Sequence, residues 1–135
     1  MRLAVDHLDG DTLLHLDLRA DNLLLRPDGS LVIIDWPWAV RGAAWVDPTL
    51  LCIEFISSGD DSVRPDEWID HVADQHGVPA AALVGLLVMA LGFFETMTRL
   101  PPPPGLPTVR AFQRFQANAL IAWLRTSRHA THLQG

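Results

Sequence analysis

The sequence contains no lysine, because all ten of its basic residues are arginine. Any mechanism that requires a lysine of this chain is therefore excluded. The arginines are outnumbered by 16 acidic residues, and the formal net charge of −6 gives no electrostatic support for a nucleic-acid partner. The single cysteine, Cys52, cannot form an internal disulfide. It lies in an apolar stretch, which indicates a small buried side chain in a reducing compartment.

Long hydrophobic runs are also scarce. The longest spans residues 80–94, which is shorter than the roughly 18 residues that suggest a membrane span, so a buried helix is expected there. The N-terminus becomes acidic at Asp6, too early for a signal peptide. With 49% hydrophobic and 19% charged residues, the chain is not intrinsically disordered. These features predict a cytoplasmic protein with no membrane partner.

Two short apolar runs near the start, residues 23–25 and 31–34, predict a β-hairpin. Residues 26–30 between them carry the turn chemistry of such a loop, with Pro27 fixing φ and Gly29 accepting a positive φ. A single helix would have to hold both residues in its interior, which is unfavourable.

The remainder of the chain predicts helices, so the fold class is α+β and mostly helical. Asp47 followed by Pro48 indicates a helix start, with the aspartate as N-cap, and that helix should end near Ile56. Three further helices are expected over residues 65–76, 79–99 and from about 108 onward. The last helix carries an apolar stripe that should lie on the core: Phe112, Phe115, Ala119, Leu120, Trp123 and Leu124.

Oxygen-bearing side chains flank the predicted hairpin. If Leu25 faces Leu31, then Asn22 faces Ile34 or Asp35 at the open end, and Asp17 lies five residues before Asn22. Clustered acidic groups raise one another's pKa, and binding of a hard divalent cation such as Mg²⁺ relieves that cost. Asn22 and Asp35 would then be metal ligands, leaving Asp17 to accept a proton from a hydroxyl, as phosphoryl transfer requires.

The segment His15-Leu16-Asp17-Leu18-Arg19-Ala20-Asp21-Asn22, the hairpin, and then Ile34-Asp35-Trp36 together resemble the catalytic core of the aminoglycoside phosphotransferase and choline kinase-like families. These families have a protein-kinase-like fold. The resemblance implies Asp17 as catalytic base, and Asn22 and Asp35 as ligands of Mg²⁺. It implies that His15 and Asp47 brace the catalytic loop. By the spacing alone, Arg19 and Asp21 are expected to be surface residues without a chemical role.

The resemblance covers only the C-terminal lobe of that fold, and we expect the N-terminal lobe to be missing. No phosphate-binding lysine or glycine-rich loop is present in the sequence. The chain is therefore interpreted as one partial domain, 1–135. Residues 1–47 would hold the catalytic loop, hairpin and metal aspartate, and residues 48–135 a helical subdomain.

The function that the resemblance implies is transfer of the γ-phosphate of ATP, or of another nucleoside triphosphate, to the hydroxyl of a small molecule with Mg²⁺. The isolated truncated chain is expected to be inactive. The alternative is a catalytically silent kinase-fold remnant or an interaction module. A metal-dependent phosphohydrolase is a third reading, but the sequence offers no further ligands with convincing spacing. Apolar surface left uncovered by a missing lobe predicts self-association or an N-lobe supplied by another chain.

Overall fold

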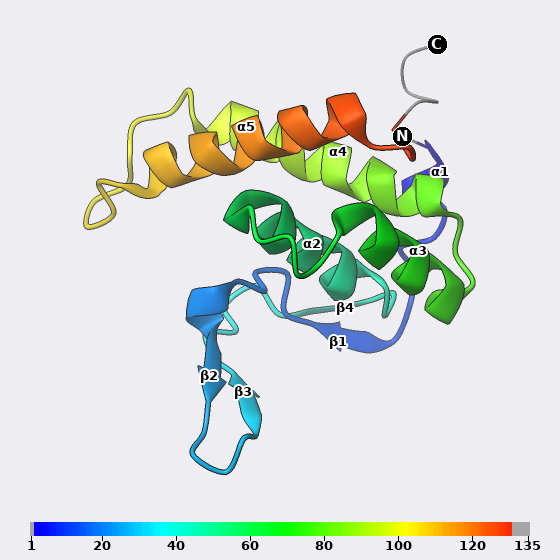
Figure 1. The fold of residues 1–135 in the computed structure, drawn as a ribbon. Helices are drawn as coiled ribbons and strands as arrows, with labels where there is room; N and C mark the ends of the chain where they lie inside the picture. The colour runs from blue at the N-terminus through cyan, green and yellow to red at the C-terminus, as the bar shows by residue number, and fades with distance from the viewer. Residues whose placement is uncertain (1, 131–135) are drawn as a thin grey trace.

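The computed structural model describes residues 2–130. Four long helices form the body, and two small strand pairs lie below them (Figure 1). The elements follow in the order α1 (Arg2–Val5), β1 (Thr12–Leu14), the 3₁₀ turn η1 (Ala20–Asn22), β2 (Leu23–Leu25), β3 (Leu31–Ile33), β4 (Val40–Gly42), α2 (Val46–Ser58), α3 (Pro65–His76), α4 (Ala80–Met97) and α5 (Val109–Thr126). The α+β, mostly helical class is confirmed.

The β2–β3 hairpin has the expected register. Leu25 pairs with Leu31 and Leu23 with Ile33, and the turn places Gly29 at φ 82°. The hairpin extends away from the helical body (Figure 1), so its leucines have little of the chain to pack against. Leu25 is 75% exposed as a result.

The hydrophobic core lies among α2, α3, α4 and α5, with β1 and the start of α2 closing one side. Ile69, Leu83, Leu87 and Leu120 are the largest fully buried aliphatic side chains. The predicted bounds of α3 are confirmed: Pro65 is its first residue, and Gly77 ends it in the left-handed conformation. Cys52 is completely buried, as expected, and burial raises the pKa of its thiol to about 12.

Two predictions about the helices are wrong in detail. Asp47 is not the N-cap of α2, because the helix begins at Val46 and Trp45 occupies the cap position. The apolar stripe predicted for α5 is right for Leu120, which is fully buried, and for Trp123, which packs against the core. It is wrong for Phe112 and Phe115, because Gln116 and Ala117 complete the buried face instead. Phe115 is 54% exposed, because the helices that α5 contacts, α2 and α4, lie on its other side.

The helix α4 is buried only in its first half, Ala82–Leu87. Among the described residues it is the one helix long and apolar enough to cross a membrane, with a mean hydropathy of 2.0 over 18 residues. A helix whose N-terminal half forms part of a core meets the same criterion, so this finding is weak. The prediction of a buried helix holds for that half alone.

The pairing of β1 with β4 was not predicted. Thr12 pairs with Gly42 and Leu14 with Val40 in an antiparallel ribbon that encloses the whole hairpin segment. These strands are three residues long and their pairing joins segments far apart in sequence, so no local pattern indicates it. The ribbon brings the chain before His15 next to the chain after Asp35.

Candidate functional site

The loop before η1 is anchored on α2 by two carboxylates. Asp47 accepts hydrogen bonds from the backbone N–H groups of His15 (2.6 Å) and Leu16 (2.9 Å). Two turns along the helix, Glu54 accepts one from the N–H of Ala20 at 3.1 Å. Asp47 and Glu54 are seven residues apart and therefore lie on the same side of α2. The loop is thus fastened at both ends to one helical face.

His15 is fully buried and joins the loop to the end of the hairpin. Its Nδ1 accepts a hydrogen bond from the N–H of Asp17 (3.2 Å), and its Nε2 lies 2.8 Å from the carbonyl oxygen of Ile34. An N–H can only donate and a carbonyl can only accept, so these partners assign the proton of the ring to Nε2. The Trp36 ring packs against His15 edge to face, with centroids 4.7 Å apart. His15 therefore orders the residues on both sides of the candidate site.

Asp17 and Asn22 are in direct contact. The Asn22 amide nitrogen donates to the backbone oxygen of Asp17 at 2.9 Å and to its carboxylate at 3.4 Å. These contacts use the Asn22 nitrogen and leave its Oδ1 atom without a hydrogen-bond donor among the described residues. Asn22 is only 5% exposed, so the packing around its side chain fixes the direction in which Oδ1 points.

Ile34 pairs with Asn22, because its N–H donates to the Asn22 carbonyl oxygen at 3.0 Å. Asp35 is the next residue in the chain. The Asp35 side chain is exposed and makes no hydrogen bond or ion pair with the side chains that the structure describes, those of residues 4–130. Its backbone is left-handed, with φ 63°, and so is that of Leu16. A non-glycine residue in this conformation costs about 1–2 kcal/mol, and such strain is concentrated at functional sites.

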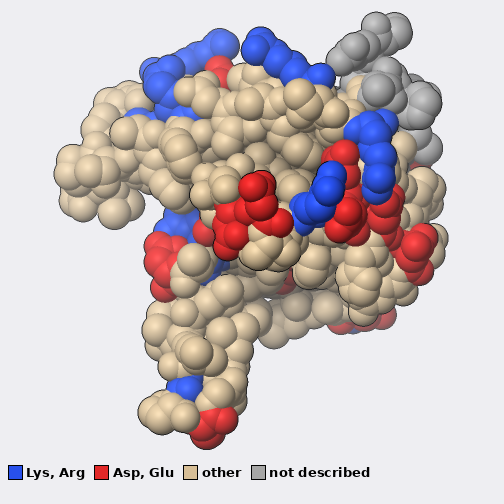
Figure 2. Space-filling view, viewed as in Figure 1, with Lys and Arg blue, Asp and Glu red and all other residues tan. Residues whose placement is uncertain are grey.

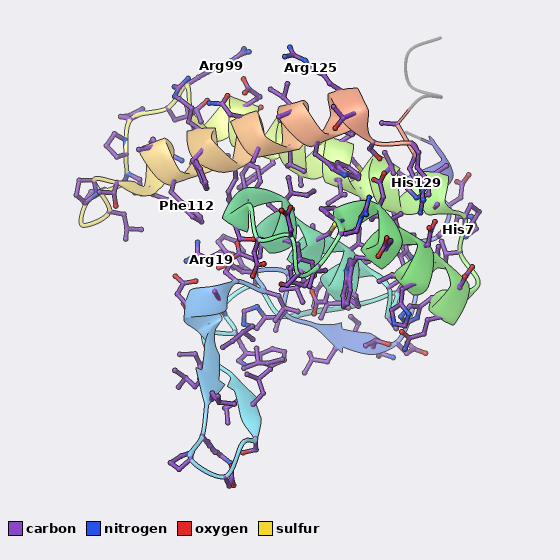
Figure 3. All side chains as sticks on the ribbon, viewed as in Figure 1. His7, Arg19, Arg99, Phe112, Arg125 and His129 are labelled. Atoms are coloured by element: carbon purple, nitrogen blue, oxygen red, sulfur yellow. The ribbon has the colours of Figure 1, made fainter. Side chains whose placement is uncertain are left out.

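Arg19 is the residue that the sequence reasoning missed. Its guanidinium binds Asp21 through two hydrogen bonds, at 3.0 and 2.5 Å, and lies 3.8 Å from the Asp17 carboxylate. It also sits over the ring of Phe112 on α5, 5.0 Å from the centroid, and the two side chains face each other in Figure 3. Arg19 therefore places a positive charge beside Asp17 and links the loop to α5. The sequence did contain a signal for this role, because Arg19 is a basic residue only two positions after the predicted base Asp17.

The electrostatics of Asp17 reflect two opposing effects. Burial raises the pKa of its carboxyl above the ordinary value, while Arg19, His15 and the Asn22 hydrogen bond act to lower it. The effect of burial is the largest, so the net shift is upward. A raised pKa makes Asp17 a better proton acceptor than an ordinary surface aspartate.

The donor set suits Mg²⁺ but supplies few ligands. Asn22 Oδ1 and the Asp35 carboxylate are hard oxygen donors without protein partners in the described chain, which is the chemistry that Mg²⁺ prefers. Residues 2–130 contain no group of three or more His, Cys, Asp or Glu side chains that could hold a metal ion. A cation held here would need water or phosphate oxygens to complete its coordination.

The acidic residues after α2 lie away from this loop. Asp60 and Asp61 line a groove of about 900 Å³ between the α2–α3 connection and the C-terminal half of α5, and none of the five predicted site residues lines it. Asp66, in the first turn of α3, accepts hydrogen bonds from Trp123 and Ser127 and so ties α3 to α5.

Comparisons of the chain with known protein families, with curated proteins and with solved structures find no match.

Proposed function

We propose that this chain is the catalytic half of a small-molecule O-phosphotransferase, with the C-lobe arrangement of a protein-kinase-like fold. The observation that carries the proposal is the joined set of Asp17, Asn22 and Asp35. A partly buried carboxylate touches an amide whose oxygen is unused, and Asp35, which carries a second carboxylate, is the next residue after the backbone bond between Ile34 and Asn22 across the hairpin. Phosphoryl transfer depends on positioning and on charge stabilisation more than on covalent chemistry, and these groups provide both.

In this proposal Asp17 accepts the proton of the acceptor hydroxyl as that oxygen attacks the γ-phosphorus of a nucleoside triphosphate. The bond from the γ-phosphorus to the bridging oxygen breaks, and the diphosphate leaves. Asn22 and Asp35 would hold Mg²⁺, which when bound offsets the negative charge of the phosphates. His15 and Asp47 keep the loop in register through their backbone contacts.

The second candidate is a catalytically silent interaction module, and one observation favours it. The chain contains no lysine to contact the nucleotide phosphates. For this reason we propose that these 135 residues alone turn over ATP very slowly or not at all, and that full activity requires an added N-lobe with a phosphate-binding lysine.

The test of the proposed site is Mg²⁺ binding, followed calorimetrically on the wild type and on Asp35→Ala and Asn22→Ala. We expect weak binding that both substitutions abolish. Asp28→Ala is the matched control, because Asp28 is an exposed aspartate in the hairpin turn whose carboxylate bonds only to Ser30. Equal Mg²⁺ affinity in the wild type and Asp35→Ala would refute the metal role. Rapid ATP turnover by the isolated wild-type chain would refute the need for a second lobe.

A further inference from the structure

The charges of this chain are divided between its two ends. None of its 16 acidic residues comes after Glu95, whereas half of its ten arginines do. The net charge of −6 is thus the sum of a strongly acidic segment and a purely basic one. The expectation of no nucleic-acid partner rested on the total charge, and the total hides this distribution. The expectation of no membrane partner rested on apolar run length, which does not test binding to a charged lipid surface.

Four of these arginines form a surface that we call the arginine face: Arg99, Arg110, Arg114 and Arg125. None of the four makes an ion pair with any residue in the range 2–130. Arg110 and Arg114 donate only to neutral oxygens, those of Pro101, Gln113 and Thr98. Their charges are therefore not neutralised within the described part of the fold.

The arginine face has a regular geometry. Arg110, Arg114 and Arg125 fall within about 60° of one another around α5, given 3.6 residues per turn. The Arg110 and Arg114 contacts with residues 98–101 bring Arg99 beside them. Figure 2 shows basic side chains along the upper edge of the molecule with little acidic surface between them, and Figure 3 places Arg99 and Arg125 above α5, on the side away from Arg19.

Exposed apolar side chains accompany the arginines at the N-terminal end of α5. Leu100 and Leu106 lie in the proline-rich connection between α4 and α5, and Phe115 lies on α5 itself, each of them about half exposed. The connection has five prolines, which cannot donate backbone hydrogen bonds. An amphipathic helix with arginines on its polar side and neighbouring Phe and Leu side chains is typical of proteins that lie on a lipid surface.

We propose that the arginine face binds the surface of a bilayer containing anionic lipids, with Leu100, Leu106 and Phe115 entering the interface. Charge complementarity argues for an anionic partner, and the aliphatic side chains argue for lipid rather than nucleic acid. Nucleic acid would favour several aromatic rings stacking among the arginines. Of Phe112 and Phe115, the exposed aromatic residues of α5, the first already has the Arg19 guanidinium over its ring, which leaves a single ring for stacking. This inference does not depend on the proposed function.

The test is co-sedimentation of the full chain with two kinds of vesicle, one of phosphatidylcholine and one in which part of it is replaced by phosphatidylglycerol. We expect binding to the anionic vesicles only, weakened by added salt. Each arginine near a charged surface contributes roughly a fivefold gain in affinity, so Arg110→Gln with Arg114→Gln should weaken binding by more than about tenfold. Phe115→Ser should weaken binding to the same vesicles without changing its salt dependence.

The matched control is Arg26→Gln with Arg64→Gln, which removes the same charge from exposed positions outside the arginine face. It should bind anionic vesicles nearly as well as the wild type. Circular dichroism of each variant establishes that the fold is retained. Equal binding to both kinds of vesicle, equal losses in the two double variants, or tighter binding to an oligonucleotide than to anionic vesicles would each overturn the proposal.

Discussion

Asp47 illustrates how one side chain can fix a loop through backbone contacts. Its two carboxylate oxygens each accept a hydrogen bond from the loop, at His15 and at Leu16. Leu16 has a positive φ, so these contacts also hold a conformation that the isolated peptide would avoid. From the sequence this residue was expected to brace the loop by resemblance and to cap its own helix by local pattern, and the two roles compete for the same oxygens.

We predict that Asp47→Asn lowers the free energy of unfolding by about 2 kcal/mol, because an amide keeps one acceptor oxygen and loses the charge. Urea unfolding measures the loss, and hydrogen exchange should show the His15 and Leu16 amides opening locally. Asp11→Asn is the control: Asp11 pairs with Arg41 at an exposed position, and such a pair contributes less than about 1 kcal/mol. Equal losses in the two variants would contradict the assigned role.

Asp17 and Asp21 should give the stability of the protein opposite pH dependences. The pKa of Asp17 is raised by burial, so the folded state holds this proton more tightly than the unfolded state does. Its contribution to the free energy of unfolding therefore falls as the pH rises through the interval above the ordinary value of 3.8. Hydrogen bonding to Arg19 lowers the pKa of Asp21, so its contribution is present above that value and is lost as the pH falls.

Accordingly, Asp17→Asn should be more stable than the wild type at neutral pH and equally stable in acid, while Asp21→Asn should be less stable at neutral pH. Urea unfolding at the two pH values distinguishes these outcomes. If both variants change stability in the same direction at neutral pH, the roles assigned to burial and to Arg19 are incorrect.

At the scale of elements, proline and glycine gave sufficient local signals for some elements and not for others. The hairpin, α3 and the start of α5 follow from such residues and from short apolar runs. The β1–β4 ribbon does not, because its pairing depends on tertiary closure around the hairpin segment. The buried face of α5 was mispredicted in part for a similar reason: Gln116 is buried because its amide meets Glu54 at 3.3 Å, a partner 62 residues away.

Two glycines test this description of the elements. A Cβ at Gly10 would lie 2.5 Å from the Gly42 carbonyl oxygen, so Gly10→Ala must displace the chain at the start of the ribbon. Gly92, inside α4, has nothing within 4 Å of such a Cβ. We predict that Gly92→Ala raises the free energy of unfolding by about 0.5–1 kcal/mol and that Gly10→Ala lowers it. Thermal unfolding compares them, and a stabilised Gly10→Ala would show that the ribbon is not closely packed there.

For the whole molecule, the projecting hairpin and the exposed aromatic residues leave apolar surface that the described chain does not cover. Leu25 and Leu31 are directly paired and both exposed, so they form one apolar spot near the hairpin tip. A two-stranded hairpin on its own is only marginally stable in water, and covering it would stabilise it.

We therefore predict that the chain self-associates with rising concentration, and that Leu25→Ser with Leu31→Ser shifts it toward the monomer. Sedimentation velocity over a concentration series measures the change. Met89→Ser, at an exposed position on α4, is the control and should leave the association unchanged. A single monomeric species for the wild type at every concentration would contradict the prediction.

The division between an acid-free end and an acid-rich remainder also gives the molecule a permanent dipole moment. The field of any extended anionic body exerts a torque on such a dipole before contact is made, so the molecule turns during its approach. The upper side of α5 would arrive first, and Arg19, which lies on the opposite side of that helix, would be carried in facing outward. Most collisions would then occur with the arginine face toward the anionic surface, before any specific contact forms between the two.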